Sequence, residues 1–288
     1  MSTSLYTENS EKWKNLASID YFTHFIKAWI PFNAWYKNYY PTIETDRKAI
    51  DEIKARPNSF RNKLISLLGS QDNVGVAFKS RIAELHQELE SKYIYNKSKN
   101  KTERITFEKI KIEDNPKTEN SFSRNSCKYE VKRSIPNRSG QIDITIYDKN
   151  NRTKFSYTQA DGYNLDNLII NSDFLKLPEN QQNNLKVCYE DINPSKPINL
   201  LIQDHELLKE IKKEKEQSKK EQNSKPTKYI EMGNFFFVNN SDYLCKGIIE
   251  ILYKLRNVLF HGEIVPDSET NKIYESAYQI LYTLIQAL

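Results

Sequence analysis

The sequence predicts a mostly α-helical protein with a β-containing insertion, and hence a fold of the α+β class. Apolar residues recur at helical spacing near both ends of the 288-residue chain. Between these ends the chain is more polar, and in places apolar and polar residues alternate as in strands. We therefore divide the chain into N-terminal helices at 1–95, a β-containing insertion at 96–228 and C-terminal helices at 229–288. The simplest assembly packs the two terminal segments into one helical bundle.

The N-terminal segment begins with an aromatic helix. Its apolar stripe is formed by Phe22, Ile26, Trp29, Asn33 and Tyr36, whose spacing of 4, 3, 4 and 3 places them on one helical face. Pro31 lies inside this stripe and lacks a backbone donor, so we expect a kink or the start of a new helix there. Further helical patterns occur at 43–55, 60–68 and 76–92.

The insertion contains the clearest strand signals. Residues 141–158 alternate around a polar turn at 148–151 and predict a β-hairpin. Two strands alone are only marginally stable, so further strands are expected to complete a small sheet. We predict these strands near 104–112, 127–134 and 185–190. Residues 204–224 predict a charged helix with Asp204 as its N-cap.

Two amphipathic helices are predicted in the C-terminal segment. The first has an apolar stripe from Leu244 to Leu259, and Gly262 stands where glycine commonly follows the end of a helix. The second has its stripe from Ile273 to Leu288. Because the link between them is short and contains Pro266, we expect an antiparallel pair.

Composition excludes several classes of site. The chain has 7 glycines, and no two are closer than six positions, so neither common glycine-rich phosphate-binding loop is present. The 3 cysteines stand alone, which argues against a C-x-x-C motif or a disulfide framework. We expect no metal site and no cofactor. The net charge of +5 is compatible with a polyanionic partner. Without a signal-like N-terminus or a membrane span, a cytoplasmic protein is expected.

A cation and an imidazole mark the most informative segment. Arg256 and His261 stand five residues apart at the end of the first C-terminal helix. A guanidinium can hold phosphate oxygens, and an imidazole can transfer protons near neutral pH. Together they suit the cleavage of RNA, whose 2′-hydroxyl is a nucleophile beside the phosphate. A structural alternative stays open, because both side chains also interact favourably with the helix dipole.

The spacing of these two residues predicts a dimer. On a regular helix, five residues correspond to about 7.5 Å of rise and about 140° of rotation. Arg256 and His261 of one chain are therefore not ideal neighbours. Two copies related by a two-fold axis could place two of each around one substrate. We accordingly expect a homodimer with a composite active site.

Two segments of the chain resemble the HEPN superfamily. The string RNVLFHGE matches an R-x4–6-H motif in which a polar residue, here Asn257, follows the arginine. The segment FIKAWIPFNAWYKNYY, at 25–40, is similar to the first helix of a bacterial HEPN group that pairs W-I-x-F-N-x-x-Y with a later R-N-x-x-F-H-G. The resemblance covers about 15–95 and 235–288, and leaves the middle of the chain uncovered.

The resemblance implies a four-helix-bundle endoribonuclease that is dimeric, needs no metal and leaves a 2′,3′-cyclic phosphate and a 5′-hydroxyl. Arg256 would bind the phosphate, His261 would be the general acid/base, and Asn257 would orient one of them or contact the substrate. The RNA could be tRNA, mRNA or rRNA. Members of the superfamily act as toxins or in anti-phage defence, so the insertion would recognise substrate, a trigger protein or an antitoxin. The alternative is a non-catalytic HEPN dimer that serves as a binding or regulatory scaffold.

Six further residues are candidates for substrate contact or support of the site. Asn33 could contact the Arg256 site or satisfy backbone groups freed by Pro31, and Glu263 could steer His261 or be simply exposed. In the insertion, basic residues interleave with aromatic ones and could hold single-stranded RNA by charge and stacking. These basic candidates are Lys132, Arg133, Arg152 and Lys154. An ordinary soluble sheet surface is the alternative.

Overall fold

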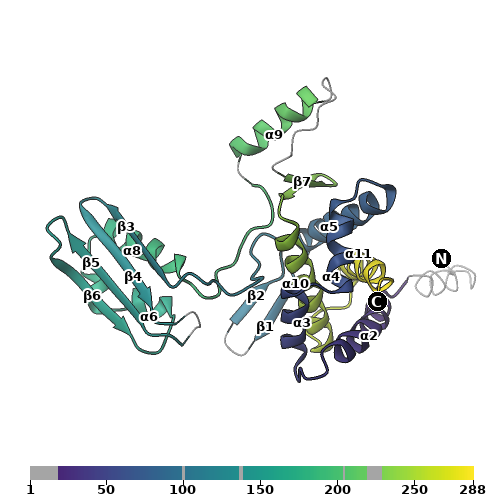
Figure 1. Cartoon of the computed structure of the whole chain (residues 1–288), viewed down its shortest axis with the longest axis horizontal. Coiled ribbons are helices and arrows are strands. Elements are labelled where there is room, and N and C mark those ends of the chain that lie inside the picture. Colours follow the sequence, from purple (N-terminus) through teal and green to yellow (C-terminus); the bar gives the residue numbers. More distant parts are fainter. Residues whose placement is uncertain (1–18, 99–100, 136–138, 204, 219–228) are drawn as a thin grey trace, which may run out of the picture. The chain divides into compact units, whose positions relative to one another are not determined.

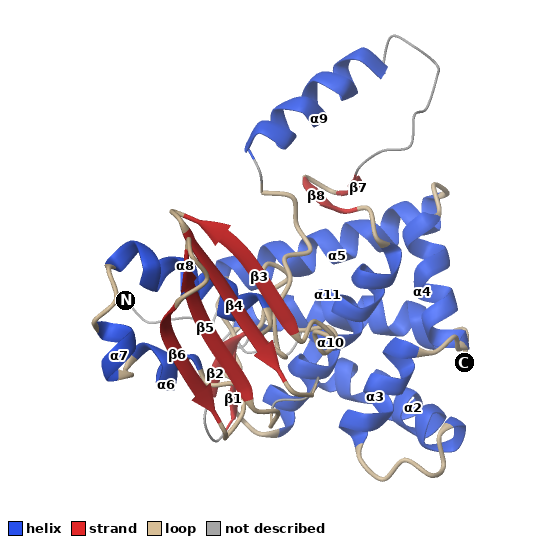
Figure 2. Ribbon diagram, turned by 60° about the vertical axis from the view of Figure 1, so that its left-hand side comes forward, coloured by secondary structure: helices blue, strands red, loops and turns tan. Residues whose placement is uncertain are grey.

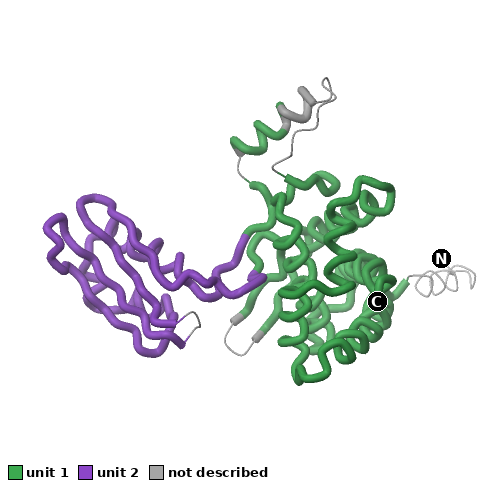
Figure 3. The backbone as a smooth tube through the Cα atoms, viewed as in Figure 1, with its two compact units in different colours: residues 1–110, 199–288 green, residues 111–198 purple. Residues whose placement is uncertain are grey.

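The computed structural model describes residues 19–98, 101–135, 139–203, 205–218 and 229–288 (Figure 1). The chain divides into two compact units (Figure 3). The helical unit takes the described residues up to Ile110 and those from Asn199 onward, and the sheet unit spans Lys111–Ile198. The sheet unit is therefore narrower than the insertion predicted at 96–228, because Phe107 and Leu200 are buried in the helical unit.

The helical unit joins helices from both ends of the chain. The N-terminal ones are α2 (Tyr21–Tyr39), α3 (Asp46–Ala55), α4 (Ser59–Gly69) and α5 (Asn73–Ser91), and the C-terminal ones are α10 (Ser241–Phe260) and α11 (Ser268–Ile285). Helix α11 packs against α2 and α5, whereas α10 packs against α3 and α4. The prediction of a mostly α fold in which the terminal segments pack together is confirmed.

Side-chain caps set where these helices begin. In each of the six helices the N-cap side chain accepts a hydrogen bond from the backbone N–H three residues later, which satisfies a donor left free in the first turn. The caps are Asp20, Thr45, Asn58, Asp72, Asn240 and Asp267. The cap at Thr45 explains why α3 begins at Asp46 instead of at 43, where the apolar pattern starts.

Helix α2 continues through Pro31, so the expectation of a new helix start there is wrong. Pro31 lies on the exposed side of the helix. Solvent can reach that side and bond the Lys27 carbonyl, which loses its donor to the proline. The opposite side buries Phe25, Trp29, Phe32 and Tyr36.

Two small hairpins complete the helical unit. Strand β1 (Tyr95–Ser98) pairs with β2 (Lys101–Arg104), and β7 (Tyr229–Met232) pairs with β8 (Phe235–Val238). The backbone near Leu200 joins the second hairpin to the chain that follows β2, because Leu200 N donates to Phe107 O at 3.0 Å and Val238 N donates to Leu200 O at 3.0 Å.

Two expectations for the flanks of the insertion change. The strand predicted at 104–112 is wrong, since β2 ends at Arg104. The charged helix is α9 (His205–Ser218), while Asp204 and the residues after Ser218 up to 228 lie outside the described residues.

The sheet unit is an antiparallel sheet in the order β3-β4-β5-β6 with helices on one face (Figure 2). Its strands are β3 (Glu119–Arg124), β4 (Cys127–Arg133), β5 (Ile142–Asp148) and β6 (Thr153–Gln159), and its helices are α6 (Leu165–Ile169), α7 (Ser172–Leu175) and α8 (Glu179–Asp191). The hairpin at 141–158 and the strand at 127–134 are confirmed. The strand at 185–190 is wrong: Leu185, Cys188 and Tyr189 are buried at helical spacing in α8.

No helix in the described part of the chain is both long enough and apolar enough to cross a membrane.

Candidate functional site

The C-terminal end of α10 is closed by a Schellman-type cap. Glu263 N donates to Val258 O at 2.9 Å, and Gly262 N donates to Leu259 O at 3.2 Å. Gly262 has a φ of +65°, the left-handed conformation that this cap requires. The prediction that Gly262 ends this helix is confirmed. The cap holds the backbone of His261 at the helix end and leaves the residue exposed to solvent.

Three neighbours hold the Arg256 side chain. Its Nη1 donates to Asn257 Oδ1 at 3.0 Å, and its Nη2 donates to Asp46 Oδ2 at 3.2 Å. Its Cζ lies 4.5 Å from the ring centroid of Phe260, within the range of a cation–π contact. The side chain is 20% exposed. Asn257 therefore contacts Arg256, and its expected role in orienting a catalytic residue stays a prediction.

Asp46 is a site residue that sequence reasoning missed. Its Oδ1 lies 3.1 Å from Lys37 Nζ on α2, while its Oδ2 accepts from Arg256 on α10. The buried phenol of Tyr36 also lies close to it. Burial, followed by the charge of Asp46, raises the pKa of Tyr36 against the opposing effect of Arg256. The carboxylate of Asp46 thus lies where α2, α3 and α10 meet.

A second charge cluster fastens α3 to α10. Glu250 accepts hydrogen bonds at 2.8 Å from Arg47 Nη1, Arg47 Nη2 and Lys54 Nζ. Glu250 and Lys54 are each 4% exposed. Burial alone would raise the pKa of Glu250, but the hydrogen bonds from Arg47 and the charges of Lys54 and Arg47 hold it below its ordinary value. Because Asp46 is on the same helix as Arg47 and Lys54, this cluster also places Asp46 beside Arg256.

The structure assigns Glu263 a contact with a strand. Its Oε2 accepts a hydrogen bond from Lys97 N on β1 at 3.0 Å, so it ties the hairpin to the end of α10. No hydrogen bond or ion pair between Arg256 and His261 is found in the described part of the chain. This agrees with their separation around the helix and leaves the composite dimeric site a hypothesis.

Asn33 keeps both of its predicted roles open. It lies on α2, in the turn between Trp29 and Tyr36. Its Oδ1 is buried and, within the described residues, has no hydrogen-bond partner. The Nε of Arg256 is also buried and, within the described residues, has no hydrogen-bond partner. Buried polar atoms without partners are uncommon in native proteins, so each of these two atoms has capacity for a further contact.

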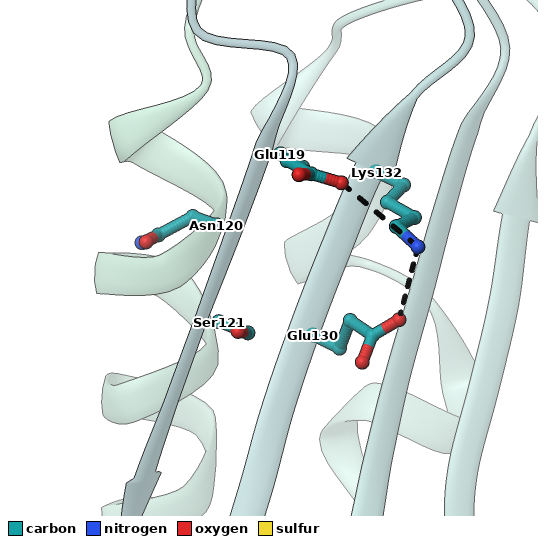
Figure 4. A pocket seen from close by; sticks show the side chains of 5 residues that line it. All are labelled: Glu119, Asn120, Ser121, Glu130 and Lys132. Atoms are coloured by element: carbon teal, nitrogen blue, oxygen red, sulfur yellow. Dashed lines mark ion pairs between the residues drawn. The ribbon is translucent and has the colours of Figure 1, made fainter.

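Lys132 is exposed on the sheet unit, and two carboxylates lie close to its ammonium group. Its Nζ lies 3.9 Å from Glu119 Oε2 and 3.7 Å from Glu130 Oε1 (Figure 4). These three residues, with Asn120 and Ser121, line a pocket of about 370 Å³. Lys128 Nζ also lies 2.8 Å from Glu130 Oε2, so two carboxylates offset the two ammonium groups and the cluster has no net positive charge to attract a phosphate backbone.

Arg133 and two of the aromatic residues near the basic candidates are buried in the sheet unit. Arg133 is 3% exposed, and its Nη2 donates to the carbonyls of Asn115 at 3.2 Å and Lys117 at 2.9 Å. Tyr129 and Phe155, two of the aromatic residues that interleave with the basic candidates, are buried in the core beneath the helices. Arg133 is therefore a structural residue, and these two rings are not available to a ligand.

Arg152 and Lys154 have local contacts instead. The backbone N–H of Arg152 donates to Asp148 Oδ1 at 2.9 Å in the turn between β5 and β6. Lys154 Nζ lies 4.0 Å from Cys127 Sγ. These contacts do not test an RNA-binding role, so Arg152 and Lys154 stay predicted substrate contacts.

Among the described residues, no three or more His, Cys, Asp or Glu side chains are grouped so that they could hold a metal ion. Comparison of the chain with protein-family models, curated proteins and solved structures finds no match. The likeness to HEPN proteins therefore rests on the residues of the two motifs.

Proposed function

We propose that the protein is a metal-independent endoribonuclease of the HEPN type. The observation that carries the proposal is the arrangement at the end of α10. There Arg256 is held by two hydrogen bonds, and His261, five residues later, is exposed to solvent. Arg256 still has N–H donors that are free to bind a ligand. A guanidinium has five N–H groups, and the contacts with Asn257 and Asp46 use one on each Nη.

The reaction would follow from these two side chains. The Nη groups of Arg256 would bind the non-bridging oxygens of a phosphodiester and stabilise the charge that develops on them. His261 would accept the proton of the 2′-hydroxyl as O2′ attacks phosphorus and the bond to O5′ breaks. A second imidazole, from the other copy of a dimer, would give a proton to O5′. The products would be a 2′,3′-cyclic phosphate and a 5′-hydroxyl, with no net gain or loss of protons.

Cleavage of RNA in EDTA tests this proposal. The purified protein is incubated with tRNA, mRNA and rRNA, beside Arg256→Ala and His261→Ala variants. We expect each variant to lose about 100- to 10,000-fold in rate, the range typical of a positioned acid or base. Arg56→Ala and His24→Ala serve as matched controls, since Arg56 is 70% exposed and pairs with Glu52 along its own helix, and His24 packs against tyrosine rings. The ends of the fragments are then identified by mass.

Two outcomes would contradict the proposal. Cleavage that persists in both variants would place the chemistry elsewhere or in a contaminant. A folded dimer that cuts none of the RNAs would favour the non-catalytic scaffold. Sedimentation tests the composite site separately, because a monomer that still cleaves RNA cannot use residues from two copies.

The same resemblance leads us to infer a role as a toxin or anti-phage effector, in which the sheet unit would recognise RNA, a trigger protein or an antitoxin. Growth arrest on expression, relieved by Arg256→Ala, would support this role. Normal growth during expression of a protein that is active in vitro would argue against it.

A further inference from the structure

We propose that Asp46 is a positioning residue for Arg256, with Lys37 balancing its charge. This inference rests on the proposed function. Asp46 is the first residue of α3, and its two carboxylate oxygens engage different helices: Oδ1 lies 3.1 Å from Lys37 Nζ on α2, and Oδ2 accepts from Arg256 Nη2 on α10 at 3.2 Å.

A carboxylate beside a phosphate-binding cation needs a physical reason. An arginine side chain has several rotatable bonds, and fixing it at the moment of reaction costs conformational entropy. Asp46 fixes one Nη, Asn257 fixes the other, and the Phe260 ring supports the guanidinium plane. The guanidinium is thereby oriented before substrate arrives, which is the usual way in which a protein lowers the cost of orienting a group.

The charge of Asp46 would also repel a phosphate unless it were offset. Lys37 offsets it, so Lys37, Asp46 and Arg256 together carry one net positive charge. Lys37 is 41% exposed and Asp46 is 27% exposed, so solvent screens their pair. Arg256 thus remains the cation that a phosphate meets, while its orientation is set by an anion.

Two other roles for Asp46 make different predictions. A purely structural role is a first-turn acid that interacts favourably with the dipole of α3. An inhibitory role is a carboxylate that occupies Arg256 in place of phosphate. Removing the carboxylate should chiefly lower kcat if Asp46 is a positioning residue. It should lower KM for RNA if Asp46 is inhibitory, because the carboxylate then competes with phosphate. It should change stability alone if the role of Asp46 is structural.

The test compares Asp46→Asn with Glu52→Gln. The first substitution keeps the size of the side chain and removes its charge. Glu52 is an acid of the same helix that pairs with Arg56 and not with Arg47, Lys54 or Arg256. We expect Asp46→Asn to lower kcat by about 10- to 100-fold with KM nearly unchanged, since a misplacement of about 1 Å costs up to about 100-fold. Glu52→Gln should leave kcat unchanged, and Asp46→Glu should keep more of the native kcat than Asp46→Asn does.

A second measurement does not depend on catalysis. Nuclear magnetic resonance of the Arg256 Nε–H group should show an ordered side chain in the native protein and increased mobility in Asp46→Asn. An equally ordered Arg256 in Asp46→Asn would overturn the inference, as would faster cleavage or an unchanged kcat. If the native protein cuts no RNA but Arg256 becomes mobile in Asp46→Asn, the proposed function fails and the positioning role stands.

Discussion

Replacing Glu250 with glutamine should destabilise the helical unit strongly. Glu250 is 4% exposed and accepts from both Nη groups of Arg47 and from Lys54. Glutamine has nearly the same shape, so the change removes charge with little loss of packing. Arg47 is 41% exposed and can turn toward water while it keeps Asp51. Lys54 is buried, and its remaining ion-pair partner is Asp51, whose Oδ1 lies 2.9 Å from Lys54 Nζ. The carboxylate of Asp51 is half exposed.

The magnitude follows from the burial of Lys54. Removing one partner of a buried ion pair costs about 3–5 kcal/mol, because the other charge is left without compensation. We expect a loss near the lower limit, about 3 kcal/mol, since the amide oxygen of glutamine can still accept one hydrogen bond. The cost of breaking the pair is not its net contribution to stability. Replacing both partners, as in Glu250→Leu with Lys54→Met, should therefore recover most of the loss.

Urea unfolding measures this effect. Trp29 and Trp35 belong to α2 of the helical unit, and residues 111–198 contain no tryptophan, so tryptophan fluorescence does not report the sheet unit. Because the folded-state pKa of Glu250 is lowered, its stabilising contribution is present above the ordinary pKa of glutamate, about 4.3, and is lost as pH falls further. The difference between native protein and Glu250→Gln should shrink accordingly in acid. A loss below about 1 kcal/mol at pH 7, or a double variant no more stable than the single one, would refute the reasoning.

Two further predictions concern backbone conformation and pH. Gly262→Ala should lower stability by about 1–2 kcal/mol in thermal unfolding, because φ is +65°, although the added Cβ would meet no described atom beyond its chain neighbours within 4 Å. Gly69→Ala is equally free of close contacts and has no positive φ, so it should cause no loss of stability. Equal losses in the two variants would contradict the argument. His86 is buried against Phe235, and burial lowers its pKa, so its contribution is intact above about pH 6.5 and falls as the unfolded chain takes up a proton below that value. His86→Leu should therefore flatten the change in urea midpoint as pH is lowered from neutral to mildly acidic, and an unchanged slope would count against this account.

Local signals explain what could be predicted from the sequence. The helix periodicity and the hairpin at 141–158 depend on residues close in the chain, as does the cap at Gly262. The strand expected at 185–190 failed because a short apolar run fits either structure, and only the longer window shows the helical spacing of α8.

The candidate site was likewise predictable only where its residues are close in the chain. Arg256, Asn257 and His261 belong to one helix end, so their grouping is a local property. Asp46 is 210 residues from Arg256, and no local pattern connects them. The burial of Arg133 could have been anticipated, because it shares its strand face with the buried residues Tyr129 and Val131.

The hydrogen bond from Leu200 N to Phe107 O has a consequence for how this chain can vary. It brings the point where the chain leaves the helical unit to within one backbone hydrogen bond of the region where it returns. For the helical unit, residues 111–198 are therefore a loop whose two ends are held close together by this hydrogen bond. The entropy cost of closing such a loop rises only slowly with its length. We therefore expect the helical unit to keep its fold when residues 111–198 are replaced by a different folded module or by a short glycine-serine turn between Ile110 and Asn199.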